Sequence, residues 1–179
     1  MDFARVLEAV ASFLDARGAR LAIAGAFALH AYGNTRATSD LDLIVEAWAQ
    51  ADLLTFVEQL GYETLYLSIG FSNHLHQQPA LGRLDFIYID DHTARLLFGG
   101  AHLMPLFPGR QVLVPRPEHL AAMKVLAMKN DPSRTFHELS DIQFLLGLPG
   151  VDTGEIRATF EQHGLAERFN ELERTIKGS

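Results

Sequence analysis

The order of apolar and polar positions predicts alternating helices and strands in the first part of the chain. Apolar residues spaced three and four apart predict amphipathic helices over 3–16 and 47–60. Between these helices, short apolar or alternating runs predict strands at 20–24 and 40–45, with a short helix over 26–32. This alternation is typical of a sheet that is covered by helices.

The middle of the chain is rich in aromatic and aliphatic residues and predicts more sheet. Strands are expected at 62–67, 71–77 and 82–89, and a further short strand at 111–114. The segment 90–100 predicts a loop with one helical turn. Four consecutive strand candidates with few helices between them favour a mixed sheet over a purely parallel one.

The pattern becomes helical after residue 115. Pro117 stands where helices commonly begin, and helices are expected over 118–129, 135–146 and, as one or two charged amphipathic segments, 153–179. The whole order predicts an α+β (α/β) fold, with a mixed β-sheet flanked by helices and a helical C-terminal lobe. We expect a core at 1–115 and a lobe at 116–179, packed together as a single compact unit.

Composition narrows the classes of protein that this chain can be. Its 179 residues are 48% hydrophobic and 21% charged, which is typical of a globular protein, and a sequence without cysteine has no disulfide framework or thiolate site. The formal net charge of −7 argues against a broad basic face for duplex DNA. No window approaches the roughly 20 apolar residues of a membrane span. Acidic residues near the N-terminus argue against a signal peptide, so we expect a cytoplasmic protein with no membrane partner.

The strongest chemical signal is a set of aspartates on two predicted strands. Asp40 and Asp42 lie two residues apart on one strand, so both carboxylates share a face and need a cation between them. Mg²⁺ is the natural candidate, because it binds through carboxylates together with substrate phosphates. Asp85, a lone acid inside an apolar strand, is expected to be a third metal ligand, with Asp90 and Asp91 as fallbacks. Three such carboxylates suit two-metal catalysis of an in-line displacement.

Two further residues suit the binding of phosphate groups. Gly25 lies at a strand-to-helix turn, where the backbone can approach a phosphate closely. Arg36, in the polar turn that precedes the aspartates, can donate to another phosphate oxygen. These assignments compete with plainer ones, in which Asp40 and Asp42 are the solvated face of an edge strand, Gly25 only packs a helix, and Arg36 is a surface residue.

The glycine turn, Arg36, Thr38 and the Asp-x-Asp pair together resemble the nucleotidyltransferase superfamily of the polymerase-beta type. Within it the segment is most similar to the AbiEii-like nucleotidyltransferases, the toxin side of type IV toxin–antitoxin pairs. The second half agrees: Lys124 in the segment 117–127 resembles the lysine motif of that group, and Asp141 in 138–146 resembles its acidic motif.

The resemblance implies magnesium-dependent transfer of a nucleotide from a nucleoside triphosphate to an acceptor hydroxyl. It implies that Asp40 and Asp42 hold metal, that Lys124 faces the triphosphate or helps to activate the acceptor, and that Asp141 orients Lys124 or takes part in proton transfer. Nucleotide-binding positions by this resemblance are Gly25, Ala26 through its backbone N–H, Arg36, Thr38 and Lys124.

Small aminoglycoside and lincosamide nucleotidyltransferases share the same core pattern, so the acceptor stays open between a transfer RNA end, a protein side chain and a small alcohol. The toxin group also implies an antitoxin partner. The sequence departs from the family at Ala26, where Gly or Ser is usual, and at His137-Glu138, where Lys-Asp is usual. The first departure supports an alternative: an inactive nucleotidyltransferase fold that binds a partner protein or a nucleotide.

Other positions have plainer interpretations that compete with a functional one. Lys124 could be a lysine at the edge of the core, and Asp141 could be an exposed acid paired with Arg134 or Lys129. His74 and His76 share one side of a strand and could hold a transition metal, although two ordinary polar strand positions are the favoured interpretation.

His30 and Trp48 are expected to have structural roles. His30 should be hydrogen-bonded within the short helix region, and Trp48 should belong to the core.

Overall fold

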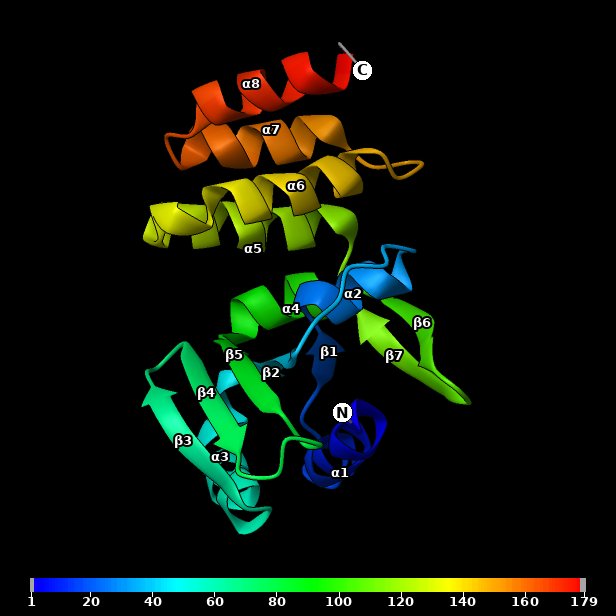
Figure 1. Ribbon diagram of the computed structural model, residues 1–179, viewed down its shortest axis with the longest axis vertical. Coiled ribbons are helices and arrows are strands. Elements are labelled where there is room, and N and C mark those ends of the chain that lie inside the picture. Colours follow the sequence, from blue (N-terminus) through cyan, green and yellow to red (C-terminus); the bar gives the residue numbers. More distant parts are fainter. Residues whose placement is uncertain (1, 178–179) are drawn as a thin grey trace. The chain divides into compact units, whose positions relative to one another are not determined.

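The computed structural model describes residues 2–177, and the chain divides into two compact units, Met1–Pro115 and Arg116–Ser179 (Figure 1). We refer to them as unit 1 and unit 2. Met1 and residues 178–179, which the predicted core and terminal helix include, lie outside the described residues. That the two parts pack as a single compact unit stays a prediction.

Unit 1 contains a five-stranded sheet with the strand order β1-β2-β5-β4-β3. Strands β2 and β5 run parallel, and every other neighbouring pair is antiparallel, which confirms the expected mixed sheet. The strands are β1 (Leu21–Ile23), β2 (Asp40–Glu46), β3 (Tyr62–Leu67), β4 (Phe71–His76) and β5 (Arg83–Ile89). Helices α1 (Phe3–Asp15), α2 (Gly25–Ala31), α3 (Gln50–Gln59) and α4 (Asp91–Gly100) complete the unit, together with a hairpin of β6 (His102–Phe107) and β7 (Arg110–Val114).

The two faces of the sheet differ in burial. On β5, Leu84, Phe86 and Tyr88 are buried, whereas Arg83, Asp85 and the other residues of the opposite face are only half-buried. In Figure 1, α3 lies behind β3 and β4, and no helix is drawn in front of these two strands. The hydrophobic core therefore fills one face, and the other face is left accessible at its β3–β4 end.

Two sequence expectations for unit 1 are wrong, and one strand was missed. Residues 91–100 form a helix and not a loop, because the Asp90 carboxylate caps it by accepting from the backbone N–H groups of His92 and Thr93. Strand β6 was not expected, since Pro105 lies inside it and proline disfavours strands. Trp48 is not in the core: it lies in a 3-10 turn before α3 and is 55% exposed.

Unit 2 consists of helices, which agrees with the helical C-terminal lobe that the sequence predicts. They are α5 (Pro117–Asn130), α6 (Thr135–Leu146), α7 (Thr153–Gln162) and α8 (Ala166–Lys177), with a short 3-10 turn between α5 and α6. Pro117 occupies the first turn of α5, where its missing N–H costs no helical hydrogen bond. Phe160 of α7 and Phe169 of α8 are both fully buried, with ring centroids 5.2 Å apart.

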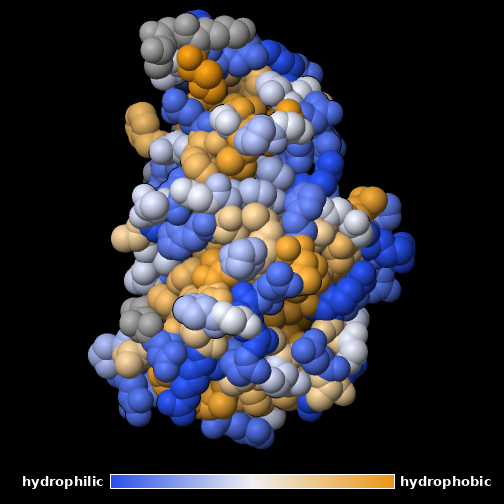
Figure 2. Space-filling model, turned by 90° about the vertical axis from the view of Figure 1, so that its right-hand side faces the viewer, coloured by the Kyte–Doolittle hydropathy of each residue, from blue (hydrophilic) through white to orange (hydrophobic). Residues whose placement is uncertain are grey.

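No helix within residues 2–177 is long and apolar enough to cross a membrane. On the side of the molecule seen in Figure 2, patches of hydrophobic surface alternate with hydrophilic side chains.

Candidate active site

Strand β2 places Asp40 and Asp42 on one face of the sheet. The alternation of the strand sends Leu41 and Leu43 into the core, and both leucines are fully buried while the two aspartates stay half-buried. Since β2 lies between β1 and β5, the alternative that this pair belongs to an edge strand is wrong.

Asp85 lies beside this pair on the neighbouring strand. The parallel register of β2 and β5 sets Asp85 directly opposite Asp42, so the two side chains share a face. We call Asp40, Asp42 and Asp85 the carboxylate row. Burial, together with the negative charges of Asp42 and Asp40, raises the pKa of Asp85 to about 7, although a hydrogen bond from Asn73 and the charge of Arg83 oppose the rise. Carboxylates that repel one another in this way favour a cation among them.

Asn73 is a member of the site that the sequence did not reveal. It faces Asp85 across the antiparallel pair of β4 and β5, is 8% exposed, and donates its Nδ2–H to Asp85 Oδ1. The hydrogen bond holds one oxygen of the Asp85 carboxylate in place. No sequence signal marks Asn73, because its position opposite Asp85 depends on the register of β4.

Gly25 packs against the carboxylate row. It begins α2 with φ of +56°, in the left-handed region that favours glycine. A β-carbon at this position would overlap the Asp42 carboxylate. The Ala24 N–H also donates to the Asp42 carbonyl oxygen over 2.9 Å. The close neighbour of Gly25 is therefore the side chain of Asp42. Ala26, the departure from the family pattern, is buried.

The polar turn before β2 is held by side-chain hydrogen bonds. The His30 imidazole bonds the carbonyl oxygen of Arg36, and the Arg36 N–H donates to Asn34 Oδ1 over 2.8 Å. His30 is thus a structural histidine, as expected. These contacts fix the backbone of Arg36 in the segment that leads into the aspartates.

The end of the same turn is tied to Asp40. The Thr38 hydroxyl accepts from the Asp40 N–H and contacts the Asp40 carbonyl oxygen, both over 3.2 Å. The Ser39 hydroxyl donates to Asp40 Oδ1 over 2.7 Å. In this arrangement Thr38 orders the start of β2.

Asp90 and Asp91, the fallback positions for the third carboxylate, lie at the start of α4. Both are exposed, and Asp90 is used as the helix cap. Hydrogen bonds from Thr93 lower the pKa of Asp90. Asp85, and not either fallback, therefore faces Asp42.

In unit 2, Lys124 and Asp141 lie in a buried charge cluster between α5 and α6. Lys124 Nζ donates to Asp141 Oδ2 over 2.5 Å and to Glu138 Oε2 over 3.1 Å. Arg134 adds a contact of 2.5 Å to Glu138 Oε1. The exposed-acid interpretation of Asp141 is wrong, since it is 3% exposed, and Glu138 is a partner of Lys124 that sequence reasoning missed.

The opposite face of β4 carries a second polar group, which we call the hydroxyl–imidazole network. It runs from Thr64 Oγ1 to His74 Nδ1 over 3.1 Å, from His74 Nε2 to Ser72 Oγ over 2.7 Å, and from Ser72 Oγ to Tyr88 Oη over 2.8 Å. Burial lowers the pKa of His74 to about 4 and raises that of Tyr88 to about 12. His76 instead contacts Leu60 and Gln78, so the plain interpretation of the two histidines is favoured.

Within residues 2–177, no group of three or more histidine and acidic side chains is arranged to hold a metal ion by itself. A cage made by protein alone is not required for Mg²⁺, which commonly takes one or two carboxylates and completes its shell with substrate phosphates and water. The carboxylate row fits such a partial site, because its charges repel one another and because Gly25 leaves room for the Asp42 carboxylate.

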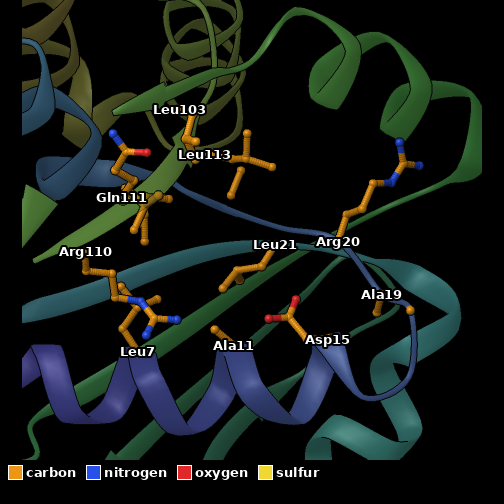
Figure 3. A pocket seen from close by; sticks show the side chains of 14 residues that line it. Leu7, Ala11, Asp15, Ala19, Arg20, Leu21, Leu103, Arg110, Gln111 and Leu113 are labelled. Atoms are coloured by element: carbon orange, nitrogen blue, oxygen red, sulfur yellow. The ribbon is translucent and has the colours of Figure 1, made fainter. Parts of the chain in front are cut away.

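A cavity of about 360 Å³ lies away from the carboxylate row, among α1, β1 and the β6–β7 hairpin (Figure 3). Its walls are mainly apolar, with Leu7 and Ala11 on the α1 side, and Asp15 also points toward it. It contains none of the residues that the sequence singled out. The cavity is therefore separate from the candidate catalytic residues.

Comparison with solved structures identifies the architecture. The antibiotic-resistance factor ANT(2'')-Ia superposes with a TM-score of 0.68 at 17% identity, with all of both chains covered. A nucleotidyltransferase-like protein from Paracoccidioides brasiliensis gives a TM-score of 0.59 at 17% identity, covering 97% of this chain and 91% of that one. The chain has a nucleotidyltransferase-like fold.

A third structure with this fold is the lincosamide antibiotic adenylyltransferase LnuA with bound lincomycin, at a TM-score of 0.52 and 16% identity over 79% of this chain and 94% of that one. No protein-family model matches the sequence, and no curated protein matches it either. The nucleotidyltransferase-like fold is thus established by structure, at identities too low to carry an activity.

Proposed function

We propose that this protein is a magnesium-dependent nucleotidyltransferase that moves a nucleotide from a nucleoside triphosphate to an acceptor hydroxyl. The observation that carries the proposal is the carboxylate row, set on two adjacent parallel strands of a nucleotidyltransferase-like fold. In the reaction the acceptor oxygen forms a bond to the α-phosphorus, the bond from that phosphorus to the pyrophosphate oxygen breaks, and the hydroxyl proton is lost.

Asp40, Asp42 and Asp85 would hold the magnesium ions. Bound magnesium supplies Lewis-acid stabilisation of the charge that develops on the attacking and leaving oxygens. The chain itself supplies the positioning. Asn73 fixes the Asp85 carboxylate, and Gly25 leaves the space in which the Asp42 carboxylate lies.

The nucleotide-binding roles of Gly25, Ala26, Arg36 and Thr38 belong to the same proposal. The turn that carries Arg36 is ordered by His30 and joined to β2 by Thr38, which supports a fixed position for the Arg36 backbone in the segment that leads into the aspartates. Lys124 is paired with Glu138 and Asp141 inside unit 2, so the positioning of Lys124 by Asp141 has direct geometric support. A role of Lys124 toward the triphosphate stays a prediction.

The AbiEii-like subgroup, a toxin role with an antitoxin partner, and a cytoplasmic location also stay predictions from the sequence. The inactive binding module is the second candidate, and only the residue at Ala26 favours it. Because Ala26 is buried and still has its backbone N–H, we prefer the enzyme.

Transfer of label tests the proposal. The protein is incubated with Mg²⁺, an α-³²P-labelled nucleoside triphosphate and a cell extract, and both pyrophosphate and labelled acceptor are measured. We expect label to move to an acceptor with the wild type and not with Asp40→Asn. Asp91→Asn, an exposed acid outside the carboxylate row, is the matched control and should keep wild-type transfer. Nucleotide binding by the wild type without pyrophosphate release would favour the inactive module.

A further inference from the structure

The face that carries the carboxylate row continues onto the β3–β4 hairpin. The register places Tyr66 opposite Asn73, which in turn lies opposite Asp85, so all three side chains share a face. Phe71 lies two residues before Asn73 on that face, with its ring 6.1 Å from the ring of Tyr66. Leu75 lies two residues after Asn73. We call Tyr66, Phe71 and Leu75 the hairpin strip.

The hairpin strip is accessible, although it is made of large apolar side chains. Tyr66 is 56% exposed, Leu75 is 41% exposed, and Phe71 is half-buried. Single exposed hydrophobic residues are common, but several large apolar side chains on one face beside polar functional side chains are typical of a binding surface. The strip begins one strand away from Asp85.

The charge of this surface selects among acceptors. On the carboxylate-row face of β3 and β4, Glu63, opposite Leu75, is the sole ionisable group other than the Tyr66 phenol. An RNA strand would require several Lys or Arg side chains along its phosphates; β3 and β4 contain none, and Arg83 of β5, opposite Leu75, is a single cation beside the strip. A polycationic amino sugar would require several carboxylates besides those that hold metal, and the hairpin offers one. An uncharged ring suits the strip, because it can pack on the Tyr66 and Leu75 side chains.

We propose that the hairpin strip binds the acceptor, and that the acceptor is a small hydroxyl compound with an uncharged aromatic or apolar ring. This inference rests on the proposed function. The ring packs on Tyr66 and Leu75, and the hydroxyl points along the sheet toward Asp85. Its oxygen then forms the new bond to the α-phosphorus while pyrophosphate leaves and the hydroxyl proton passes to water.

The test measures pyrophosphate release with Mg²⁺ and ATP against three probes. They are a p-nitrophenyl glycoside as the neutral ring-bearing alcohol, tobramycin as the polycationic amino sugar, and a short RNA with a free 3′-hydroxyl. We expect the glycoside to give the fastest pyrophosphate release. Tyr66→Ser and Leu75→Ser should each raise the KM for the glycoside by about 3- to 10-fold, which corresponds to the loss of one ring-packing contact, and leave the KM for ATP unchanged.

Two further variants separate binding from folding. Tyr66→Phe keeps the ring and should keep the KM of the wild type, whereas Leu96→Ser removes a leucine on α4 that is more exposed than Leu75 and should change neither KM. Transfer to tobramycin or RNA in preference to the glycoside would overturn the inference and leave the proposed function intact. Absence of pyrophosphate with every probe and with a cell extract would overturn both.

The same variants test another occupant of the strip. If Tyr66→Ser and Leu75→Ser convert a dimer into a monomer while the KM for the glycoside stays at the wild-type value, the strip is a contact between copies of the chain, and the inference fails.

Discussion

The two faces of strands β4 and β5 carry two polar clusters that differ in charge: one consists of neutral groups, and the other of carboxylates. On the core face, the hydroxyl–imidazole network joins neutral groups in a continuous chain of hydrogen bonds, with His74 fully buried. On the other face, the carboxylate row brings together groups of the same charge, and Asp42 raises the pKa of Asp85. Asn73, which donates to Asp85, and His74, which belongs to the network, are adjacent residues on opposite faces.

This difference separates a structural cluster from a binding one. A buried polar network whose donors and acceptors are matched stabilises the fold without any ligand. Side chains of one charge, held together by strand register, cost free energy until an ion of the opposite charge joins them. We therefore expect substitutions in the carboxylate row to change activity, and substitutions in the network to change stability.

The largest effect should follow Asp42→Asn. Loss of one charged metal ligand should reduce nucleotidyl transfer by about three orders of magnitude, the equivalent of several kcal/mol of transition-state stabilisation. Steady-state pyrophosphate release measures it, and Ser72→Ala in the network is the control that should keep its turnover. Comparable losses in both variants would remove the distinction between the two clusters.

Gly25→Ala sharpens the comparison by disturbing the carboxylate row through the backbone. Its methyl group would overlap the Asp42 carboxylate, so turnover should fall by about tenfold or more, with a stability loss of about 1–2 kcal/mol from the positive φ. Gly33→Ala is the matched control, since Gly33 also has a positive φ but no atom near its missing β-carbon. Thermal denaturation and turnover should show strain in both variants and lost turnover in the first alone.

The pH dependence of stability should differ in sign between the clusters. Without metal, Asp85 keeps its proton in the folded state up to about pH 7 but loses it near 3.8 when unfolded, so its contribution to the free energy of unfolding falls as pH rises through that window. His74 stays neutral in the folded state down to about pH 4 but becomes protonated below 6.5 when unfolded, so its contribution falls as pH decreases.

Urea denaturation between pH 4 and 8 in EDTA measures these contributions. Asp85→Asn should raise stability at pH 8 relative to wild type by about 2 kcal/mol, after allowance for its partial exposure. His74→Asn should abolish a loss of about 3 kcal/mol that accompanies the fall from pH 6.5 to 4. Parallel pH profiles for wild type and both variants would contradict the burial argument.

Tyr88→Phe should have the smallest effect. It deletes one hydroxyl from the network and leaves Ser72 with one partner fewer, so we expect a stability loss of about 1 kcal/mol. Turnover should stay at the wild-type value. A variant as stable as wild type but inactive would place Tyr88 in the chemistry and not in the fold.

The sequence allowed the paired aspartates to be placed on one face, because strand alternation is a local property. It also marked Asp85, since a charge inside an apolar strand needs a partner. It did not reveal Asn73, whose role depends on which residue the register sets opposite Asp85. Helix α4 was hidden because its Asp90 cap resembled a loop residue, and β6 because it contains Pro105.

The binding of Mn²⁺, measured by electron paramagnetic resonance with a non-hydrolysable nucleoside triphosphate, tests the central claim most directly. The account predicts that wild type and His74→Asn sequester Mn²⁺ together with the nucleotide, and that Asp42→Asn and Asp85→Asn do not. Equal Mn²⁺ binding by all four proteins, or none by the folded wild type, would contradict it.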